Sequence, residues 1–269
     1  MTTIKEVAIG LIGMLCAENH EGDIYILQKN LSEKNIERMR SALKSYLHPS
    51  NINNKCRHGL TLLHHFVIVG DLESVKFLIF NGADLNIKDK KNETPLLTSA
   101  KYKHFEIAKF FLENGATEDS FSNEHLSVLH FAAESADLDF IKFLIKKGLN
   151  IEAKDANFQT PLFWIYGDDN AILKIKLFLE NGANINLRDK NGDTPLHSFI
   201  NRHDCYPPLE VVKFFLENGA DINLRNKYKQ TVIDLVRVED SDFFYYDDER
   251  ERFNLVRNYL LNYQELPPF

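Results

Sequence analysis

The stretch that decides the fold is DKNGDTPLH, residues 189–197. Asp189, Asn191 and Asp193 stand at alternate positions, as the first oxygen ligands of a calcium loop do. The same letters also describe a joint between two elements, because NG is a tight-turn dipeptide and TP is a favoured start of a helix. The rest of the chain decides between a metal site and a joint.

Relatives of TPLH recur along the chain. A threonine or serine followed by an apolar dipeptide or by Pro-Leu stands at Thr61, Thr94, Ser127, Thr160, Thr194 and Thr231, with spacings of 33, 33, 33, 34 and 37 residues. A second marker, similar to NGAD, begins at positions 81, 114, 147, 181 and 218 and keeps the same beat. Because two unrelated motifs stay in phase, the sequence predicts a repeat protein.

Each repeat contains signals for two helices. Thr194 is a good N-cap and the following proline suits the first helical position, which predicts a short helix from about 195 to 201. A second helix is indicated by apolar residues with i, i+3, i+6 and i+7 spacing, as in Leu138, Ile141, Leu144 and Ile145. A glycine then ends that helix, and a polar stretch such as INLRDKNGD favours a projecting finger.

A 33-residue unit of two antiparallel helices and a finger, with TPLH and GADIN signatures, resembles the ankyrin repeat family. The resemblance covers about residues 48–237, and its motifs are weak at both ends. It implies an all-α solenoid of stacked antiparallel helix pairs, with β-turn fingers along one concave side. One helix pair cannot bury its own apolar face, so neighbouring pairs must stack and the ends need caps.

The expected organisation is one continuous solenoid with three parts. Residues 1–55 are interpreted as a degenerate N-terminal capping repeat with an insertion, 56–237 as ankyrin repeats, and 238–269 as a C-terminal capping helix with an insert. Seven acidic residues of 239–251 surround four aromatic ones in that insert. It is either a solvated loop or a docking peptide or lid over the final repeat.

Composition restricts the classes of partner. The 269-residue chain has a net charge of −7, which argues against nucleic acid or an anionic membrane as its partner, although a local basic patch remains compatible. No stretch reaches the roughly 20 apolar residues of a membrane span, and the apolar run 7–17 only loosely imitates a signal peptide. Cys16, Cys56 and Cys205 form no CxxC pair, which favours a reducing, cytoplasmic compartment.

The chain carries no recognisable catalytic or metal motif. A calcium loop needs glycine at its sixth position and glutamate at its twelfth, where this sequence has Thr194 and Ile200. Signatures of nucleotide-binding loops, zinc proteases, serine hydrolases and kinases are absent from the sequence. Cys205 follows His203 and Asp204, but proximity in sequence is not triad geometry. We expect no cofactor, no metal and no enzymatic activity.

A histidine recurs at the fourth position of the TPLH signature, at His64, His130 and His197. A metal site or a proton-transfer group is one interpretation. The resemblance to ankyrin repeats favours a structural role, in which the ring bonds to the backbone of the neighbouring repeat. The other repeats tolerate Leu97, Phe163 and Asp234 at this position.

The resemblance places a partner-binding surface on the finger tips and the exposed ends of the first helices. The predicted residues are Arg57, His58, Lys90, Lys91, Lys101, Tyr102, Phe158, Arg202, Lys227 and Tyr228. Basic residues dominate the early fingers, whereas the third finger contains Glu118, Asp119 and Glu124. The hypothesis is that a basic early half and an aromatic later half contact a protein.

Phe158 stands where other fingers have Gly59 and Gly192, and a bulky side chain is awkward at such a position. With Tyr102, Tyr228 and the aromatic residues Trp164 and Tyr166 it forms a candidate anchor set, of residue types enriched at binding hot spots. For Trp164 core packing is the favoured interpretation.

Three functions are weighed. The favoured one is a monomeric, non-enzymatic module that recognises a partner protein. The second is a secreted effector or an adaptor mimic that bridges two host proteins in the host cytoplasm. It is suggested by heavy use of Lys, Asn, Ile and Phe, which resembles effectors of intracellular bacteria and comparable viral proteins. The third is a targeting subunit of an enzyme complex.

Overall fold

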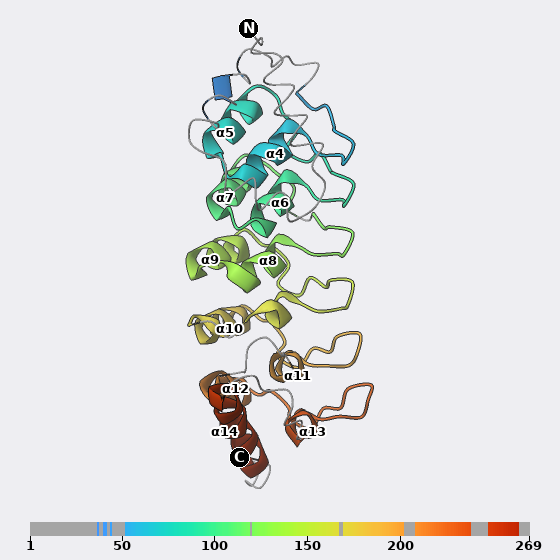
Figure 1. Ribbon diagram of the computed structural model, residues 1–269, viewed down its shortest axis with the longest axis vertical. Helices are drawn as coiled ribbons and strands as arrows, with labels where there is room; N and C mark the ends of the chain where they lie inside the picture. The colour runs from blue at the N-terminus through green and yellow to red at the C-terminus, as the bar shows by residue number, and fades with distance from the viewer. Residues whose placement is uncertain are drawn as a thin grey trace. The chain divides into compact units, whose positions relative to one another are not determined.

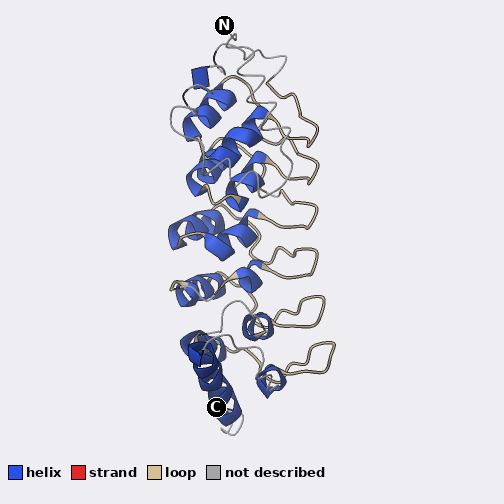
Figure 2. Ribbon diagram, viewed as in Figure 1, coloured by secondary structure: helices blue, strands red, loops and turns tan. Residues whose placement is uncertain are grey.

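The computed structural model describes residues 37, 40, 41, 44, 52–118, 120–166, 169–201, 208–237 and 247–263. The chain divides into two compact units, Met1–Val128 and Leu129–Phe269. Helices and loops make up the described residues, and no strand is found among them (Figure 2). The expected all-α class is therefore confirmed.

The part of unit 1 from residue 52 onward contains two helix pairs (Figure 1). The first pair is α4 (Leu62–Val69) with α5 (Leu72–Phe80), and the second is α6 (Pro95–Lys101) with α7 (Phe105–Glu113). The first helices of the two pairs pack against each other, because α4 contacts α6. The second helices do the same, because α5 contacts α7. Each pair thereby covers the apolar face that the other leaves open.

Unit 2 shows the same alternation of first and second helices (Figure 1). Its elements are α8 (Val128–Ser135, which begins at the last residue of unit 1), α9 (Leu138–Lys146), η1 (Pro161–Trp164), α10 (Ala171–Glu180), α11 (Pro195–Ile200), α12 (Leu209–Glu217), α13 (Val232–Arg237) and α14 (Asp247–Tyr263). The first-helix elements η1, α11 and α13 are shorter than the first helices of unit 1. The last helix packs on α12 and α13.

The threonines begin the first helices as the sequence predicts. The hydroxyl oxygens of Thr61, Thr94 and Thr194 each accept the backbone N–H three residues later, which satisfies one of the unpaired donors at a helix start. Asp71 does the same for α5 by accepting from Ser74. Its carboxylate also binds the guanidinium of Arg40, with Nη2 at 2.6 Å.

The helix predicted after Thr160 is the exception. It is a single 3-10 turn, Pro161–Trp164, and Ile165 is already extended at φ −76° and ψ 123°. The Thr160 side chain makes no capping hydrogen bond. The sequence at 167–170 is Gly, Asp, Asp and Asn, and these residue types are weak helix formers.

The predicted apolar faces of the second helices are buried at their central positions. Val75, Leu78, Ile141 and Leu144 are fully buried. The first member of each pattern is half-buried, and the last is half-buried or, as in Leu112 and Leu216, buried. A further position is buried in α5, α7, α9, α10 and α12 and is not part of the predicted apolar pattern. It holds Ser74, Ile107, Phe140, Lys174 and Val211.

Candidate partner-binding surface

In five of the six described fingers, one acceptor side chain shapes the turn. The side-chain oxygens of Asp89, Ser122, Asp155, Asp189 and Asn226 accept backbone N–H groups two and four residues later. In DKNGD, Oδ1 of Asp189 receives these bonds at 2.7 and 3.0 Å. The stretch is a joint whose carboxylate shapes the turn. Among the described residues, no group of three His, Cys, Asp or Glu side chains is placed to hold a metal.

The fourth residue of every finger turn has a left-handed backbone. Glycine, which suits this conformation, is found only twice among the six positions, which are Gly59, Asn92, His125, Phe158, Gly192 and Lys229. Phe158 has φ 64°, so the predicted conformational strain at this bulky residue is confirmed.

Backbone hydrogen bonds join neighbouring finger tips into a row within each unit. In unit 1, Lys90 N donates to His58 O at 3.2 Å, and the next tip is joined in the same way through Lys91 O. In unit 2, the distances are 2.7 Å from Lys190 N to Asn157 O and 2.7 Å from Lys227 N to Asn191 O. Within each unit the fingers project to the same side of the helix pairs (Figure 1).

The predicted residues on the fingers of unit 1 lie close together. Arg57 Nε donates to His58 Nε2 at 2.9 Å, at the tip that is bonded to the next finger. Lys90 and Lys91 are exposed on that next finger. The structure therefore gathers these four predicted residues on two adjacent tips.

Lys101 and Tyr102 lie at the end of α6 and are less accessible. Lys101 Nζ pairs with the largely buried Glu93 carboxylate at 2.9 Å. Tyr102 is the C-cap residue of α6 and is half-buried. Lys101 and Tyr102 therefore make contacts within the repeat at the C-terminal end of α6, and only their exposed parts are available to a partner.

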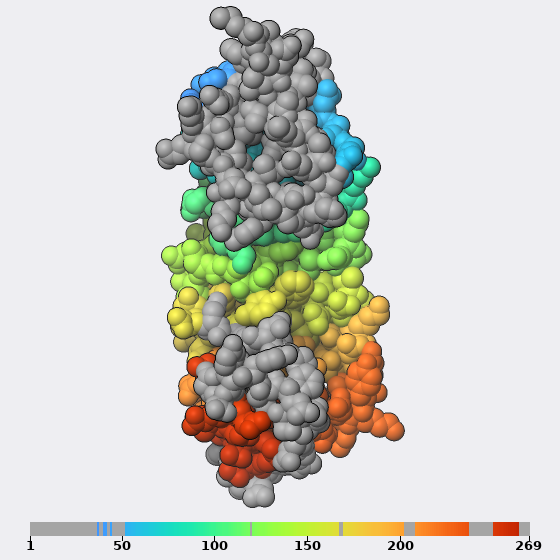
Figure 3. Space-filling model, viewed as in Figure 1, coloured from blue at the N-terminus to red at the C-terminus, as the bar shows by residue number. Residues whose placement is uncertain are grey.

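The aromatic residues of unit 2 stand out from the finger tips. The side chains of Phe158 and Tyr228 are 53% and 65% exposed. Lys154 Nζ lies 6.0 Å from the Phe158 ring centre, and Lys227 Nζ lies 5.0 Å from the Tyr228 ring centre. Both are cation–π distances, so each exposed ring is paired with an exposed cation. The finger of residues 223–230 projects from one edge of the unit (Figure 3).

Trp164 packs inside the repeat rather than standing at a tip. Its Nε1 donates to Asp155 Oδ2 at 3.3 Å, and its ring meets the His130 ring edge-on at 6.0 Å. The half-buried tryptophan thereby supports the finger that carries Phe158, in agreement with the packing interpretation. Tyr166 remains exposed. Arg202 and the insert residues 239–246 lie outside the described residues.

Several exposed cations lie outside the ten residues that the sequence predicts for the partner-binding surface. Lys55, Lys88, Lys154, Arg188 and Arg225 occupy one fixed position of the repeat, four residues before the left-handed residue, and all are exposed. Two of them reach the same position of the next finger. Lys55 Nζ donates to Lys88 O at 2.8 Å, and Arg188 Nη2 donates to Arg225 O. The recurrence of a basic residue at this position is the signal that identifies them.

The repeated histidines are structural. His64 and His197 place Nδ1 beside the threonine of their own N-cap. Nε2 of His64, His130 and His197 lies 3.1 to 3.4 Å from a backbone carbonyl of the next finger. Burial lowers the pKa of each of the three rings, which favours the neutral form. The predicted bond to the neighbouring repeat is confirmed.

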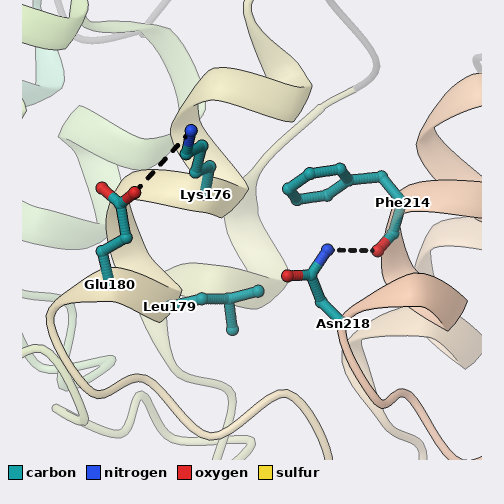
Figure 4. A pocket seen from close by; sticks show the side chains of 5 residues that line it. All are labelled: Lys176, Leu179, Glu180, Phe214 and Asn218. Atoms are coloured by element: carbon teal, nitrogen blue, oxygen red, sulfur yellow. Dashed lines mark hydrogen bonds and ion pairs between the residues drawn. The ribbon is translucent and has the colours of Figure 1, made fainter.

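The second helices of unit 2 carry a separate depression of about 340 Å³ between α10 and α12 (Figure 4). Lys176, Leu179, Glu180, Phe214 and Asn218 line it. The lysine pairs with the glutamate at 3.8 Å, and the asparagine amide donates to the Phe214 carbonyl at 2.8 Å. None of the predicted partner-binding residues belongs to it. No described helix combines the length and the apolar character needed to cross a bilayer.

Comparison with known proteins agrees with this geometry. A family model described as ankyrin repeats (3 copies) matches residues 14–122, 63–155 and 129–226, which together exceed half of the chain. Alpha-latrotoxin of Latrodectus geometricus is 25% identical over 42% of this chain and 8% of its own length. An ankyrin repeat protein of Variola virus is 31% identical over 39% of this chain and 20% of its own length.

Protein phosphatase 1 regulatory subunit 27 of Homo sapiens is 32% identical over 32% of this chain and 51% of its own length. The chain thus spans about half or less of the length of these relatives. Ankyrin repeats are generally non-enzymatic and act as modules for protein–protein interaction. The period, the helix pairs, the finger turns and the family match lead to one assignment: the chain belongs to the ankyrin repeat family.

Proposed function

We propose that the chain recognises a partner protein, without catalysis, through its finger tips and the exposed ends of its first helices. One observation carries the proposal. Backbone hydrogen bonds join neighbouring tips, such as Lys190 to Asn157 and Lys227 to Asn191, so that tip residues far apart in sequence form a row. A row held by the backbone is organised before binding, which reduces the entropy lost on association.

The side chains on these rows differ from one repeat to the next, although the backbone turn is the same. Tip positions carry Arg57 and Lys90 in unit 1, and Phe158 and Tyr228 in unit 2. Aromatic residues and arginine are enriched at the centres of protein interfaces. A constant scaffold with variable exposed side chains supports recognition of one specific surface.

The test is capture of the partner by a variant of the finger surface. In Lys91→Glu, Tyr102→Ala, Phe158→Ala, one charge is reversed and two aromatic side chains are truncated. We expect partner capture to fall by about tenfold or more, since hot-spot truncations cost about 2 kcal/mol each.

The matched control makes the same kinds of change on the second helices, with Lys142→Glu, Phe80→Ala and Leu173→Ala. These three side chains are exposed. The control is expected to retain the partner. Equal capture by both variants, or loss in the control alone, contradicts the proposed surface.

A second candidate is a targeting subunit of an enzyme complex. It is supported by the 32% identity to a human phosphatase regulatory subunit. In that case an enzymatic activity copurifies with the wild-type chain and is lost with the finger variant. Copurification that survives the variant places the enzyme contact elsewhere.

A third candidate is an effector or adaptor mimic that bridges two host proteins in the host cytoplasm. It is supported by the matches to ankyrin repeat proteins of Variola virus and fowlpox virus. A bridge requires a ternary complex. Two-step purification through this chain and then through the first partner recovers the second partner if the bridge exists, and recovers none if it does not.

A further inference from the structure

We propose that the three fingers of unit 2, residues 152–159, 186–193 and 223–230, bind an acidic segment of the partner that also carries aromatic or aliphatic side chains. We call these residues the basic finger face. The inference rests on the proposed function and specifies the chemistry of the partner.

On the basic finger face the positively charged side chains are exposed and the negatively charged ones are not. Its cations are all exposed, and they are Lys154, Arg188, Lys190, Arg225, Lys227 and Lys229. Its acids are all buried or half-buried, and they are Glu152, Asp155, Asp189 and Asp193. A chain whose net charge is −7 therefore presents positive charge on these fingers.

Hydrogen bonds explain why the acids turn inward. Oδ1 of Asp155 and Oδ1 of Asp189 each accept two backbone N–H groups of their own turn. Asp193 Oδ1 accepts from Asn226 Nδ2 on the next finger at 2.9 Å. These carboxylates therefore lie inside the fingers next to hydrogen-bond donors, and the exposed charged side chains are lysines and arginines.

Two cations are available without disturbing the fingers. Arg188 and Arg225 bond to carbonyls of the finger turns, since Arg188 Nε donates to Gly192 O at 3.1 Å and Arg225 Nη1 donates to Lys229 O at 2.7 Å. In contrast, the ammonium groups of Lys190 and Lys229 have no side-chain or backbone partner among the described residues. These two are therefore suitable for pairing with carboxylates of a bound segment.

Exposed rings lie within the same row. Phe158 follows Asn157, whose carbonyl accepts from Lys190, and Tyr228 follows Lys227, which donates to Asn191. Rings and cations thus alternate along the bonded tips. An aromatic or aliphatic side chain of the partner buries apolar area on the rings, while neighbouring carboxylates meet the lysines.

The observations favour an acidic protein segment over nucleic acid. The chain as a whole is negative, and a long polyanion that extends past the fingers meets this repulsion. A short acidic segment stays close to the six cations, within a Debye length of about 10 Å at moderate salt. A short acidic segment is therefore attracted to the finger cations without being repelled by the negative charge of the rest of the chain.

The test uses a fluorescein-labelled peptide of glutamate and phenylalanine residues, its Glu→Gln counterpart, and a single-stranded oligonucleotide of equal charge. Fluorescence anisotropy measures binding to the full chain. We expect the acidic peptide to bind best and to bind more weakly as salt rises. In Lys190→Glu, Lys229→Glu its affinity is expected to fall by about tenfold, as for lost charge pairs at an interface.

The control is Lys146→Glu, Arg252→Glu, which changes the net charge equally on exposed positions of α9 and α14. It is expected to change the affinity by less than about twofold, because charges far from the bound peptide are screened by salt. Equal loss in both variants, equal binding of the Glu→Gln peptide, or tighter binding of the oligonucleotide each overturns the proposal. Circular dichroism of every variant checks folding, and Lys190→Gln, Lys229→Gln repeats the test if charge reversal disturbs it.

The same variants separate this inference from the proposed function. If the finger variant Lys91→Glu, Tyr102→Ala, Phe158→Ala loses the partner while Lys190→Glu, Lys229→Glu retains both partner and peptide, recognition by fingers stands and the acidic chemistry is wrong. If neither variant affects partner capture, the proposed function itself fails.

Discussion

His64 and Glu93 are joined across two successive repeats, because Nε2 of the histidine lies 3.3 Å from the glutamate carbonyl oxygen. Nδ1 of the same ring lies 2.9 Å from the Thr61 hydroxyl and 3.2 Å from its backbone nitrogen. One buried imidazole therefore completes the N-cap of α4 and holds the next finger. The corresponding ring of His197 makes the same set of contacts in unit 2.

His64→Ala is expected to destabilise the chain by about 2–3 kcal/mol. The substitution leaves a buried carbonyl and an N-cap donor without their partner, and each such loss costs about 1 kcal/mol or more. Urea unfolding measures the change. His58→Ala, at a half-buried finger position, is the control and is expected to change stability by less than about 0.5 kcal/mol. Similar losses in both variants contradict the bridging role.

The stability of the chain is expected to fall in mild acid. Burial lowers the pKa of His64 and His104, and it lowers the pKa of His65 to about 4. The unfolded chain, with histidine pKa values near 6.5, binds protons first as the pH falls. The stabilising contribution is therefore complete above about pH 6.5 and is lost as the pH falls through the folded pKa values.

For His65 the shift to about 4 corresponds to roughly 3 kcal/mol between the two limits. Urea unfolding at a series of pH values from about 7 to 4.5 measures the loss. His65→Gln is expected to flatten the profile, because this side chain does not titrate. A free energy of unfolding that stays constant or rises on acidification contradicts the assignment of these rings as buried and neutral.

Gly70→Ala is expected to cost more than Gly82→Ala. Both glycines have a left-handed backbone, with φ of 82° and 90°, so both substitutions carry a strain of about 1 kcal/mol. A Cβ at Gly70 would lie 2.5 Å from Cε1 of His104, whereas a Cβ at Gly82 meets nothing within 4 Å. The clash adds about 1–2 kcal/mol, as overpacking does.

The two alanine variants are compared by thermal or urea unfolding. The half-buried His104 ring cannot move freely, because its Nε2 lies 3.1 Å from Ile68 O. In the His104→Ala background the extra cost of Gly70→Ala should disappear. An equal cost of Gly70→Ala with and without His104 means that backbone strain alone is responsible.

The repeat could be predicted from sequence because its signals are local. Thr194 and its proline start a helix by hydrogen bonding within three residues, and Ile141 and Leu144 are spaced for one face. Lys174 was missed because its long apolar stem is buried while its ammonium group reaches Ala133 O at 3.4 Å, a contact across 41 residues.

The candidate surface was predictable only in part, because exposure depends on the direction of side chains. The sequence DKNGD contains two acids and one lysine, but it does not reveal that Asp189 turns into the finger while Lys190 faces outward. For Trp164 the sequence favoured core packing over an anchor role, but it did not reveal that the indole N–H donates to Asp155. These differences depend on contacts that form only when the finger closes.

Phe158→Gly is expected to stabilise the chain and weaken partner binding. The left-handed backbone of Phe158, with φ 64°, costs a non-glycine residue about 1–2 kcal/mol, and glycine removes this strain. The added freedom of glycine in the unfolded chain offsets about 0.5–1 kcal/mol, which leaves a net gain of roughly 0.5–1 kcal/mol. The ring is 53% exposed, so its removal loses little packing.

Phe158→Ala separates the two effects, because alanine removes the ring but keeps the backbone strain. Its stability should remain close to that of the wild type, while its partner affinity should fall as far as that of Phe158→Gly. Strain retained at an exposed tip is most simply explained by a benefit in binding. If Phe158→Gly is more stable and binds the partner as tightly as the wild type, the phenylalanine is not an anchor and the contact must be assigned to other finger residues.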